Sequence, residues 1–537
     1  MKKLLHGLPR HSRGTRITDN PGIRGARGLR IILLPASCFL LTASSLASTN
    51  YVWQSSPTPT APYSSWATAA HTIQNAVDAA NSNNTVPFTN GFYNSGMKIL
   101  FGSSSNRVAI TKPLLLKSVN DICDTIISGS NNVRTLFITA GVEVEGFTIT
   151  GGYVVTSFGD AEHDYGGNVL CWSGGVVRTS LIIGGGAWIA GGNVCCYYGG
   201  VVDDCEITYG YCMNSGGGAA CQDGGAVKNS IIKNNIGNAG GGIHSEGGTI
   251  ENNIIIENIT YNDGGGINTS YSIIRNCLVA KNFAYRDGGG IYAYFSSLQN
   301  NTICSNKADK TGGGVASWDN TNANNIIYYN LPDNYTNNFP GDAAMFNCSY
   351  PKIPGDNNSV TNEPNFIDYQ NGDYRLLHDS PCFNAGTNEA WMVGIPDLSY
   401  QNRIIDGTVD IGAYEIGKLI CEFNAEPLSG IVPLNVNFNS IVSGTNIVNV
   451  YFFWDFDNDG KYDSTGLWQD ITQFIYTNEG FYSVSLTVSN SASETAEKTV
   501  AGYIEVVPEP GAFGAVIGYL LLVIGIGRKF ITMKISG

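Results

Sequence analysis

Four aspartates in the last third of the chain have the residue type and spacing of a calcium site. Asp455, Asp457, Asp459 and Asp463 form the pattern D-x-D-x-D-G-x-x-D around a glycine turn. Ca²⁺ is a hard cation that prefers carboxylate and other oxygen ligands. The loop is not an EF-hand, because its twelfth position is Gly466 where a bidentate Glu is required. We predict Ca²⁺ as the only cofactor; the alternative is a solvated acidic hairpin that binds nothing.

A second set of titratable residues lies near the middle of the chain. Asp223 and Glu246 fall in nearly the same column of a repeat, and His244 precedes Glu246 by two residues. Stacked carboxylates can shift each other's pKa and act as an acid and base pair on a polysaccharide. These three residues are weak catalytic candidates, because acidic residues in turns are more often simply solvated.

Two further acidic groups could also do chemistry. Asp263 and Asp287 each stand just before Gly-Gly-Gly, and Arg286 is adjacent, so they could hold Ca²⁺ beside an arginine base. The other of these two groups, Asp-Ala-Glu-His-Asp, occupies residues 160–164. Solvated turn residues are the alternative for both groups.

A repeat must position most of these residues. Gly-Gly begins a unit at residues 166, 191, 216, 240, 264, 288 and 312, a spacing of 24 or 25. Each unit holds short β-favouring runs separated by Gly, Asn or Asp, and an amphipathic helical stretch is absent from the units, which excludes helical solenoids. A unit of this length with three short strands fits one coil of a right-handed parallel β-helix, which we place at 100–345.

Columns of like residues support stacked coils. One asparagine column holds Asn252, Asn276, Asn300 and Asn324, and a second holds Asn235, Asn258, Asn282, Asn306 and Asn330. Coils stack ~4.8 Å apart, so these amides can form ladders that pair the turns. Sugar binding is the alternative role for the columns. We expect Ile254, Leu278 and Ile326 to face the interior, and we expect mostly free buried thiols for the in-register Cys171, Cys196 and Cys221.

The two ends of the repeat array have their own sequence features. In the cap at 50–99, Ile73, Ala76, Val77 and Ala80 fall on one helical face that can cover the open first coil. Here the chain resembles the pectate-lyase-like superfamily of bacterial β-helix proteins. The segment 346–418, with Asp373-Tyr-Arg-Leu and Val409-Asp-Ile-Gly-Ala-Tyr-Glu415, resembles the closing segment of secreted β-helices of the choice-of-anchor group. This resemblance covers roughly residues 50–416 and implies the fold; the superfamily mixes lyases, hydrolases, esterases and non-catalytic surface proteins.

Residues 421–507 differ from the repeat in composition and pattern, because glycine becomes rarer and alternating strands appear. Trp454-Asp455-Phe456 and Gly480-Phe-Tyr482 resemble a PKD-type Ig-like sandwich, although Asp457-Asn458 lengthens the family's turn. Such modules usually space or bind rather than catalyse. The predicted fold class is therefore all-β: a parallel β-helix of about 24-residue coils followed by an Ig-like β-sandwich, with a C-terminal transmembrane helix.

The ends of the chain differ in charge from its body. Residues 1–49 carry eight Lys or Arg residues against Asp19, and the tail after Val507 carries three against Glu509, whereas the whole chain has a formal charge of −14. An acidic body repels nucleic acid, which we exclude as a partner. The basic start and the apolar run at 31–43 predict a signal peptide at 1–47 with a long basic region and cleavage after Ala47.

The C-terminal segment 508–529 predicts a sorting signal. Pro508-Glu509-Pro510 precedes sixteen uncharged residues at 512–527 and the basic pair Arg528-Lys529. Together they resemble the PEP-CTERM signal, which implies recognition by an exosortase-type protease of a Gram-negative bacterium and delivery to the cell surface or matrix. The apolar run predicts a membrane helix that anchors the chain transiently or permanently, although it is shorter than the ~30 Å hydrocarbon core requires.

These features favour an exported, surface- or matrix-sorted, non-catalytic protein in adhesion, extracellular matrix or carbohydrate binding. The alternative is a polysaccharide lyase or glycoside hydrolase acting in a β-helix groove, for which the aromatic residues Tyr292, Tyr294, Phe295 and Trp318 could stack sugars. The sequence lacks the paired aspartates and the arginine signature of well-known β-helix enzymes, which favours the first function.

Overall fold

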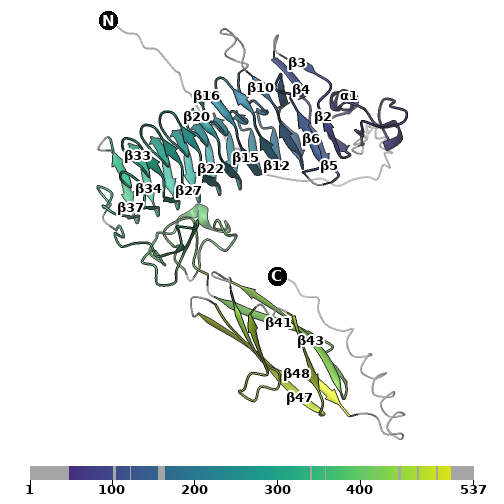
Figure 1. Cartoon of the computed structure of the whole chain (residues 1–537), viewed down its shortest axis with the longest axis vertical. Helices are drawn as coiled ribbons and strands as arrows, with labels where there is room; N and C mark the ends of the chain where they lie inside the picture. The colour runs from purple at the N-terminus through teal and green to yellow at the C-terminus, as the bar shows by residue number, and fades with distance from the viewer. Residues whose placement is uncertain are drawn as a thin grey trace, which may run out of the picture. The chain divides into compact units, whose positions relative to one another are not determined.

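The computed structural model describes residues 48–508, apart from 101–103, 121, 155–163, 339–340, 357, 406, 418, 445–448, 468–470 and 491–493. Figure 1 shows successive coils stacked into a solenoid, with the helix α1 near one end. The predicted signal peptide, the 160–163 part of the acidic group and everything after Pro508 lie outside the described residues. Within them, no helix is long and apolar enough to cross a membrane.

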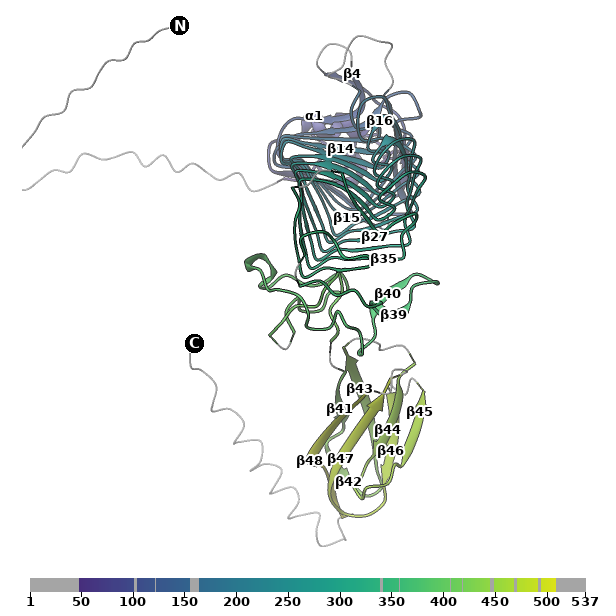
Figure 2. The same cartoon turned by 90° about the vertical axis from the view of Figure 1, so that its left-hand side faces the viewer.

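One coil illustrates the repeat. It contains β21 (Ile243–Glu246), β22 (Thr249–Glu251), β23 (Ile254–Ile256) and β24 (Ile259–Thr260), so the coil has four short strands, one more than predicted. Each strand pairs in parallel and in register with the strand 24 residues later, as Ile243 does with Ile267. The stacked flat coils are visible in Figure 2. The predicted parallel β-helix is confirmed.

Among the described residues, the equivalent strands of successive coils form three sheets. The largest has 20 strands: β1 (Asn84–Phe88), β2 (Gly91–Tyr93), β5 (Leu114–Ser118), β6 (Thr125–Ser128), β8 (Val142–Glu145), β9 (Thr148–Thr150), β12 (Val176–Ile183), β15 (Val201–Thr208), β18 (Ala226–Lys228), β19 (Ile231–Lys233), β22, β23, β26 (Ile273–Arg275), β27 (Leu278–Ala280), β30 (Ser297–Gln299), β31 (Thr302–Cys304), β34 (Thr321–Ala323), β35 (Ile326–Tyr328), β37 (Ala343–Met345) and β38 (Cys348–Ser349). The second has 11: β3 (Lys98–Leu100), which pairs antiparallel, β4 (Ser104–Ile110), β7 (Arg134–Ile138), β11 (Val169–Trp172), β14 (Val194–Tyr197), β17 (Ala219–Gln222), β21, β25 (Ile267–Ser270), β29 (Ile291–Tyr294), β33 (Val315–Trp318) and β36 (Tyr335–Asn337). The third has seven: β10 (Tyr153–Val154), β13 (Gly186–Ala187), β16 (Tyr211–Ser215), β20 (Ile236–Ala239), β24, β28 (Phe283–Ala284) and β32 (Lys307–Ala308).

Glycine begins each unit because the backbone requires it there. Gly264 has φ +74°, a left-handed conformation that L side chains rarely adopt. A Cβ on the next residue, Gly265, would lie 2.2 Å from the carbonyl oxygen of Gly289 in the following coil. The Gly-Gly spacing therefore marks a place where successive coils approach each other closely.

The asparagine ladders are of two kinds. In the buried column, Asn258 Nδ2 donates to Asn282 Oδ1 and Asn282 Nδ2 donates to Asn306 Oδ1, both at 3.0 Å. A third column that the sequence did not reveal lies beside the predicted Asn252 column, where Asn301 Nδ2 donates to Asn325 Oδ1 at 3.0 Å. These side chains pair polar groups that the solenoid interior would otherwise leave unsatisfied.

The Asn252 column lies on the outside of a turn, which we call the asparagine corner. It joins the β22 and β23 positions of each coil, and its residues all have positive φ: Thr179, Asp204, Asn229, Asn252, Asn276, Asn300, Asn324 and Phe346. Asn252 Nδ2 donates to Asn229 Oδ1 at 2.8 Å, and Asn324 Nδ2 donates to Asn300 Oδ1 at 3.1 Å. Asparagine tolerates this backbone region better than most residues, so the column is a structural feature of the turn.

The expectation for the apolar columns is wrong. Ile255, Val279, Ile303 and Ile327 fill the interior, whereas Leu278 and Ile326 are buried in a separate cluster with Phe366, Leu376 and Ile411 and with the half-buried Ile254. The corner residue at positive φ shifts the alternation, so Ile254, Leu278 and Ile326 point outward. The outer face of these coils is therefore apolar and needs a cover.

The closing segment provides that cover. It contains β39 (Phe366–Asp368) and β40 (Asp373–Leu376), which pair antiparallel, and the short 3₁₀ helix Ala390–Met392. Asparagine-corner amides hold it in place: Asn276 Nδ2 donates to the carbonyl of Pro396 at 3.0 Å, and Asn324 Nδ2 donates to that of Thr387 at 2.9 Å. Arg275 also lies over the ring of Trp391, 4.7 Å from its centroid.

The cap contains the predicted amphipathic helix. A 3₁₀ turn at Trp66–Thr68 precedes α1 (Ile73–Ala79), which begins after the N-cap Thr72 and buries Ile73, Ala76 and Val77. Ala80 is the C-cap and is also buried. β1 already pairs with β5, so the first coil starts inside the range 50–99 that was predicted for the cap.

The cysteines described by the structure are free thiols. Eleven of these twelve are buried, and Cys123 is exposed. Cys171, Cys196 and Cys221 stack in register in the interior, as their spacing predicted. Burial raises the pKa of Cys205 to about 12 and that of Cys277 to about 12, so both remain protonated at neutral pH.

The described residues between 419 and 508 form a β-sandwich. In the described part, one sheet has β41 (Ile420–Glu426), β43 (Leu434–Ser443) and β46 (Ile471–Tyr476), and the other has β42 (Ser429–Ile431), β44 (Tyr451–Asp455), β45 (Ser464–Leu467), β47 (Gly480–Ser489) and β48 (Thr495–Val507). Trp454 is fully buried among Phe423, Phe438 and Phe456. The eight strands give this domain a hydrophobic core of its own.

Candidate functional site

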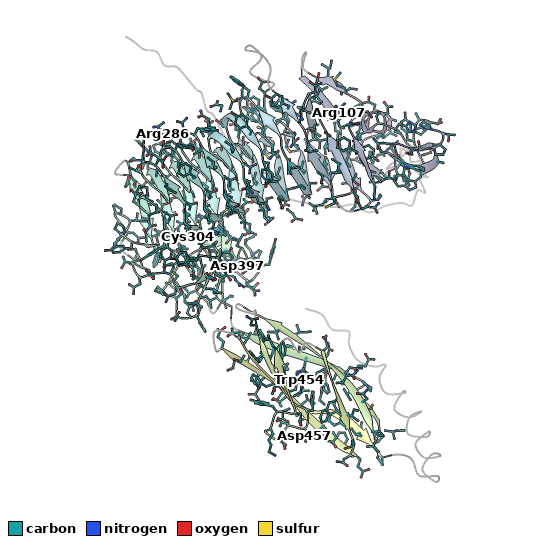
Figure 3. All side chains as sticks on the ribbon, in the orientation of Figure 1. Arg107, Arg286, Cys304, Asp397, Trp454 and Asp457 are labelled. Atoms are coloured by element: carbon teal, nitrogen blue, oxygen red, sulfur yellow. The ribbon has the colours of Figure 1, made fainter. Side chains whose placement is uncertain are left out.

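The acidic loop follows β44 in the sandwich domain. Asp455, Asp457 and Asp463 each place a carboxylate oxygen within 4.8 Å of the others. Asp459 is not part of this cluster, because its carboxylate pairs with the Lys461 ammonium at 3.1 Å. Figure 3 labels Trp454, which lies between the sheets, and Asp457, which lies in the loop beyond the strand. The structure thus gathers three of the four predicted ligands.

Backbone amides preorganise the loop. Asp455 accepts from the N–H of Asp459 at 3.2 Å and from that of Gly460 at 2.9 Å, and Asp463 accepts from the N–H of Phe456 at 2.7 Å. The pKa of Asp457 is raised, first by partial desolvation and then by repulsion from Asp463. Converging carboxylates that repel each other are the arrangement that a divalent cation would relieve.

The predicted catalytic group Asp223, His244 and Glu246 lies on the 11-stranded sheet and the turn after it. Glu246 ends β21 and pairs in register with Gln222, and the N–H of Asp223 donates to the carbonyl of Glu246 at 3.0 Å. The side chains of Asp223 and Glu246 are both exposed. Desolvation lowers the pKa of His244 to about 4, so its imidazole is neutral at physiological pH and weakly basic.

The other acidic candidates serve the solenoid itself. Asp263 Oδ1 accepts from the N–H of Asp287, and Asp287 Oδ1 accepts from the N–H and hydroxyl of Thr311 in the next coil. Arg286, labelled in Figure 3, pairs with Asp263 at 3.5 Å. These contacts bind coil to coil, so Asp263 and Asp287 act as turn residues in the structure.

The structure also shows a buried charged cluster that the sequence did not predict. Asp397, Arg403, Asp410 and Glu415 are at most 2% exposed and lie together in the closing segment. Arg403 Nη1 lies 3.3 Å from Glu415 Oε1, and Asp410 accepts from the N–H groups of Asn384 and Ile416. Burial raises the pKa of Asp410 to about 6 and that of Glu415 to about 9. The motif at 409–415 contains Asp410 and Glu415, but it does not reveal that they are buried with Asp397 and Arg403, because the four residues meet only when the segment folds.

Aromatic side chains lie along one corner of the solenoid. Tyr294 and Phe295 are 38% and 42% exposed, whereas Tyr292 and Trp318 are half-buried. Tyr294, Phe295, Trp318 and Asp319 line a hollow of about 190 Å³ with mostly apolar walls. Such surfaces suit ligands with apolar faces and hydrogen-bonding edges.

The fold is therefore that of a parallel β-helix protein with a β-sandwich domain. The PKD domain family model matches residues 421–501, which confirms the predicted PKD-type domain. A search of curated protein sequences finds no match.

Two solved structures are among those that match. One, described as the structural basis for the promiscuous specificity of carbohydrate-binding modules from the β-sandwich superfamily, is 23% identical with a TM-score of 0.16 and covers 18% of this chain and 38% of its own. The other, pectate lyase Pel9A, is 15% identical with a TM-score of 0.37 and covers 69% of this chain and 97% of its own.

Proposed function

We infer that this protein is an exported, surface- or matrix-sorted, non-catalytic β-helix protein that associates with carbohydrate. The observation that supports this function most strongly is how the solenoid uses its acidic residues. Asp263 and Asp287 are engaged by backbone groups of the following coil, and Glu251 pairs with Lys228 and Arg275. Their roles are structural, while aromatic side chains remain at the surface.

The weak catalytic group supports the same conclusion. A general base works best with a pKa near the working pH, and the pKa of His244 is about 4. Asp223 and Glu246 extend into solvent from adjacent coils without an arginine or lysine in register beside them. Enzymatic polysaccharide cleavage is the alternative function, and the exposed Asp223 and Glu246 are its candidate residues.

One assay tests this function. The purified full chain is incubated with neutral and acidic polysaccharides, and new reducing or unsaturated ends are measured. We expect sedimentation of protein with at least one polysaccharide and no new ends. Cleavage that disappears in Asp223→Ala but persists in Asp309→Ala would overturn the non-catalytic function.

The PEP-CTERM-like tail supports surface sorting. We propose that Pro508, Glu509 and Pro510 are recognised by an exosortase-type protease of a Gram-negative bacterium and that the helix at 512–527 with Arg528-Lys529 anchors the chain before processing. Mass spectrometry of the mature protein tests this sorting. A mature form that begins at Ser48 and ends near the motif is expected; a form that retains both ends contradicts it.

The acidic loop supports a calcium site. We propose that Asp455, Asp457 and Asp463 hold Ca²⁺, with Asp459 free to exchange its Lys461 partner for the ion. Calorimetry on the full chain should detect Ca²⁺ binding that is lost in Asp457→Asn. The exposed Asp368, which caps its own turn through Asn371, provides the matched control Asp368→Asn. No heat from the full chain at millimolar Ca²⁺ would refute the site.

A further inference from the structure

A turn joins the 11-stranded sheet to the β22 position of each coil. The first residue of this turn has a left-handed backbone conformation, which some of the residue types found there disfavour. We call this turn the aromatic corner. Its residues share positive φ, and they are Ser173, Tyr198, Asp223, Gly247, Tyr271, Phe295 and Asp319. Gly, Asp and Ser are compatible with a tight turn, whereas bulky aromatic residues in the left-handed region are rare and strained.

The backbone does not need these aromatic side chains. The N–H of Tyr271 donates to the carbonyl of Tyr294 at 3.0 Å, as the N–H of Gly247 donates to that of Ser270 at 2.9 Å. Gly247 thus satisfies the same hydrogen bond without a side chain. The rings are also not buried, because Tyr198, Tyr271 and Phe295 remain 51%, 62% and 42% exposed. The hydrogen bond between coils therefore explains neither the choice of aromatic residues at this corner nor their exposure.

Aromatic residues in the adjacent strand column extend the corner at both ends. At the first end, Trp172 and Tyr197 pair in register with rings stacked at 5.0 Å, and Tyr198 packs edge-on against Tyr197 at 4.2 Å. At the second end, Tyr294 and Trp318 pair in register.

The rings at the second end form a shaped surface. Tyr271 and Phe295 are parallel at 5.5 Å with an interplanar angle of 2°. Tyr294 stands edge-on to Phe295, at an interplanar angle of 88°. Its ring face is therefore nearly perpendicular to the faces of the Tyr271–Phe295 pair. The hollow lined by Tyr294, Phe295 and Trp318 lies among these rings.

Polar residues separate the two aromatic groups. The register runs from Tyr197 through Gln222, Glu246 and Ser270 to Tyr294, one residue per coil. Coils are ~4.8 Å apart, so Trp172 and Trp318 are separated by about 29 Å along the solenoid. The surface thus has aromatic rings at both ends and hydrogen-bonding groups between them. These features are complementary to an extended polymer whose units carry both apolar faces and hydroxyl groups.

The charge of this surface selects among such chains. Its ionisable acidic members are Asp223, Glu246 and Asp319, and neither the corner nor the column from Trp172 to Trp318 contains Lys or Arg. These three carboxylates would repel an anionic polymer, and no cation within the corner or the column would attract one. Neutral sugar rings can stack on the aromatic faces and donate hydroxyl hydrogen bonds to the carboxylates.

We propose that the aromatic corner, together with the Trp172–Trp318 column, is a binding track for a linear neutral polysaccharide laid along the solenoid axis. This track rests on the proposed association with carbohydrate and assigns it a site and a ligand class. Asp223 and Glu246, the weak catalytic candidates, lie in the middle of the track and hydrogen-bond the bound sugar.

Titration calorimetry of the full chain with cellohexaose, xylohexaose and mannohexaose tests the track. We expect one hexasaccharide to bind, and Tyr294→Ala to weaken its affinity about tenfold, because one stacking ring is lost from the centre of the second group. Tyr294→Phe retains the ring and should bind within about twofold of the wild type. Tyr261→Ala removes an exposed ring that stacks on Tyr285 away from the track, and it should leave affinity unchanged.

Length and charge of the probe give further readouts. The hexasaccharide should bind more tightly than the corresponding trisaccharide, because only the longer chain extends beyond one aromatic group. Polygalacturonate should not compete. Tight binding of polygalacturonate that is unaffected by Tyr294→Ala would overturn the track.

The failure of the track and the failure of the proposed function give different results. If the wild type and Tyr294→Ala bind a neutral hexasaccharide equally, the track is wrong and the association with carbohydrate stands. If the wild type binds none of the three hexasaccharides and no polysaccharide in the sedimentation assay, both are wrong. Circular dichroism of each variant verifies that the solenoid is folded.

Discussion

The asparagine corner and the aromatic corner share a left-handed backbone conformation but differ in their side chains. Asn276 and Tyr271 both have positive φ, and the N–H of each donates to a carbonyl of the next coil at 3.0 Å. The Asn276 amide then bonds to Pro396 of the closing segment, whereas the Tyr271 ring remains exposed. One corner therefore makes polar contacts with another segment of the chain, whereas the rings of the other contact one another and remain exposed.

The largest expected effect concerns the interior beside the asparagine corner. Asn301 is fully buried, and its amide accepts from the N–H of Cys277 and donates to the carbonyl of Ile274, both at 3.0 Å. Asn301→Ala should lower the free energy of unfolding by about 3 kcal/mol, because it leaves buried polar groups unsatisfied. Urea denaturation measures this loss. The exposed Asn371→Ala is the control, and a loss below about 0.5 kcal/mol for Asn301→Ala would show that the ladder is not needed.

The closing segment attached to the asparagine corner should become less stable as pH rises. Burial raises the pKa of Asp410 to about 6 and that of Glu415 to about 9, above the unfolded values near 4, despite the nearby Arg403. A raised folded pKa gives a contribution that is complete below the unfolded pKa and is lost as pH rises through the folded pKa. Stability should thus fall between about pH 4 and pH 9, by a few kcal/mol in total.

Thermal unfolding at several pH values measures this dependence. Glu415→Gln keeps the shape of the side chain without its titration, so the slope above pH 6 should become smaller. A slope identical to that of the wild type would mean that Glu415 is not the responsible group.

At the aromatic corner, a substitution should weaken binding without a large loss of stability. Tyr271→Gly relieves a left-handed conformation and removes an exposed ring, so the free energy of unfolding should remain within about 1 kcal/mol of the wild type or rise. Affinity for the bound hexasaccharide should fall about fivefold. Denaturation and calorimetry on the same sample compare the two. A large loss of stability would make the ring a structural ladder and would contradict the contrast between the corners.

The smallest expected effect is in the sandwich domain. Ca²⁺ at the proposed site should raise the unfolding temperature of this domain by a few degrees, because a ligand that binds only the folded state stabilises it. Removal of Ca²⁺ with a chelator, or the substitution Asp455→Asn, should abolish this rise. An equal rise in Asp455→Asn would assign the effect to another site.

The repeat made most of the fold predictable. Gly-Gly spacing, stacked Asn columns and the apolar face of 73–80 indicate the coils and the cap helix, because each signal is local or strictly periodic. The direction of Ile254, Leu278 and Ile326 was predicted wrongly, since a single left-handed residue such as Asn252 reverses the alternation that a regular strand would keep.

The candidate sites were less predictable. Asp455, Asp457 and Asp463 are close in sequence and meet in one loop, but the pairing of Asp459 with Lys461 depends on the turn geometry. Arg403 and Glu415 meet only through the folding of an irregular segment. The aromatic corner can be identified only when φ values and exposure are known, because the sequence does not distinguish an exposed Tyr from a buried one.

The most direct test of a non-catalytic, carbohydrate-associated solenoid is a combined binding and product assay with the neutral hexasaccharides. We expect tight association of one hexasaccharide with the full chain, its recovery intact by chromatography after prolonged incubation, and weaker association in Tyr294→Ala. Shortened products that vanish in Asp223→Ala would contradict the account and make the protein an enzyme.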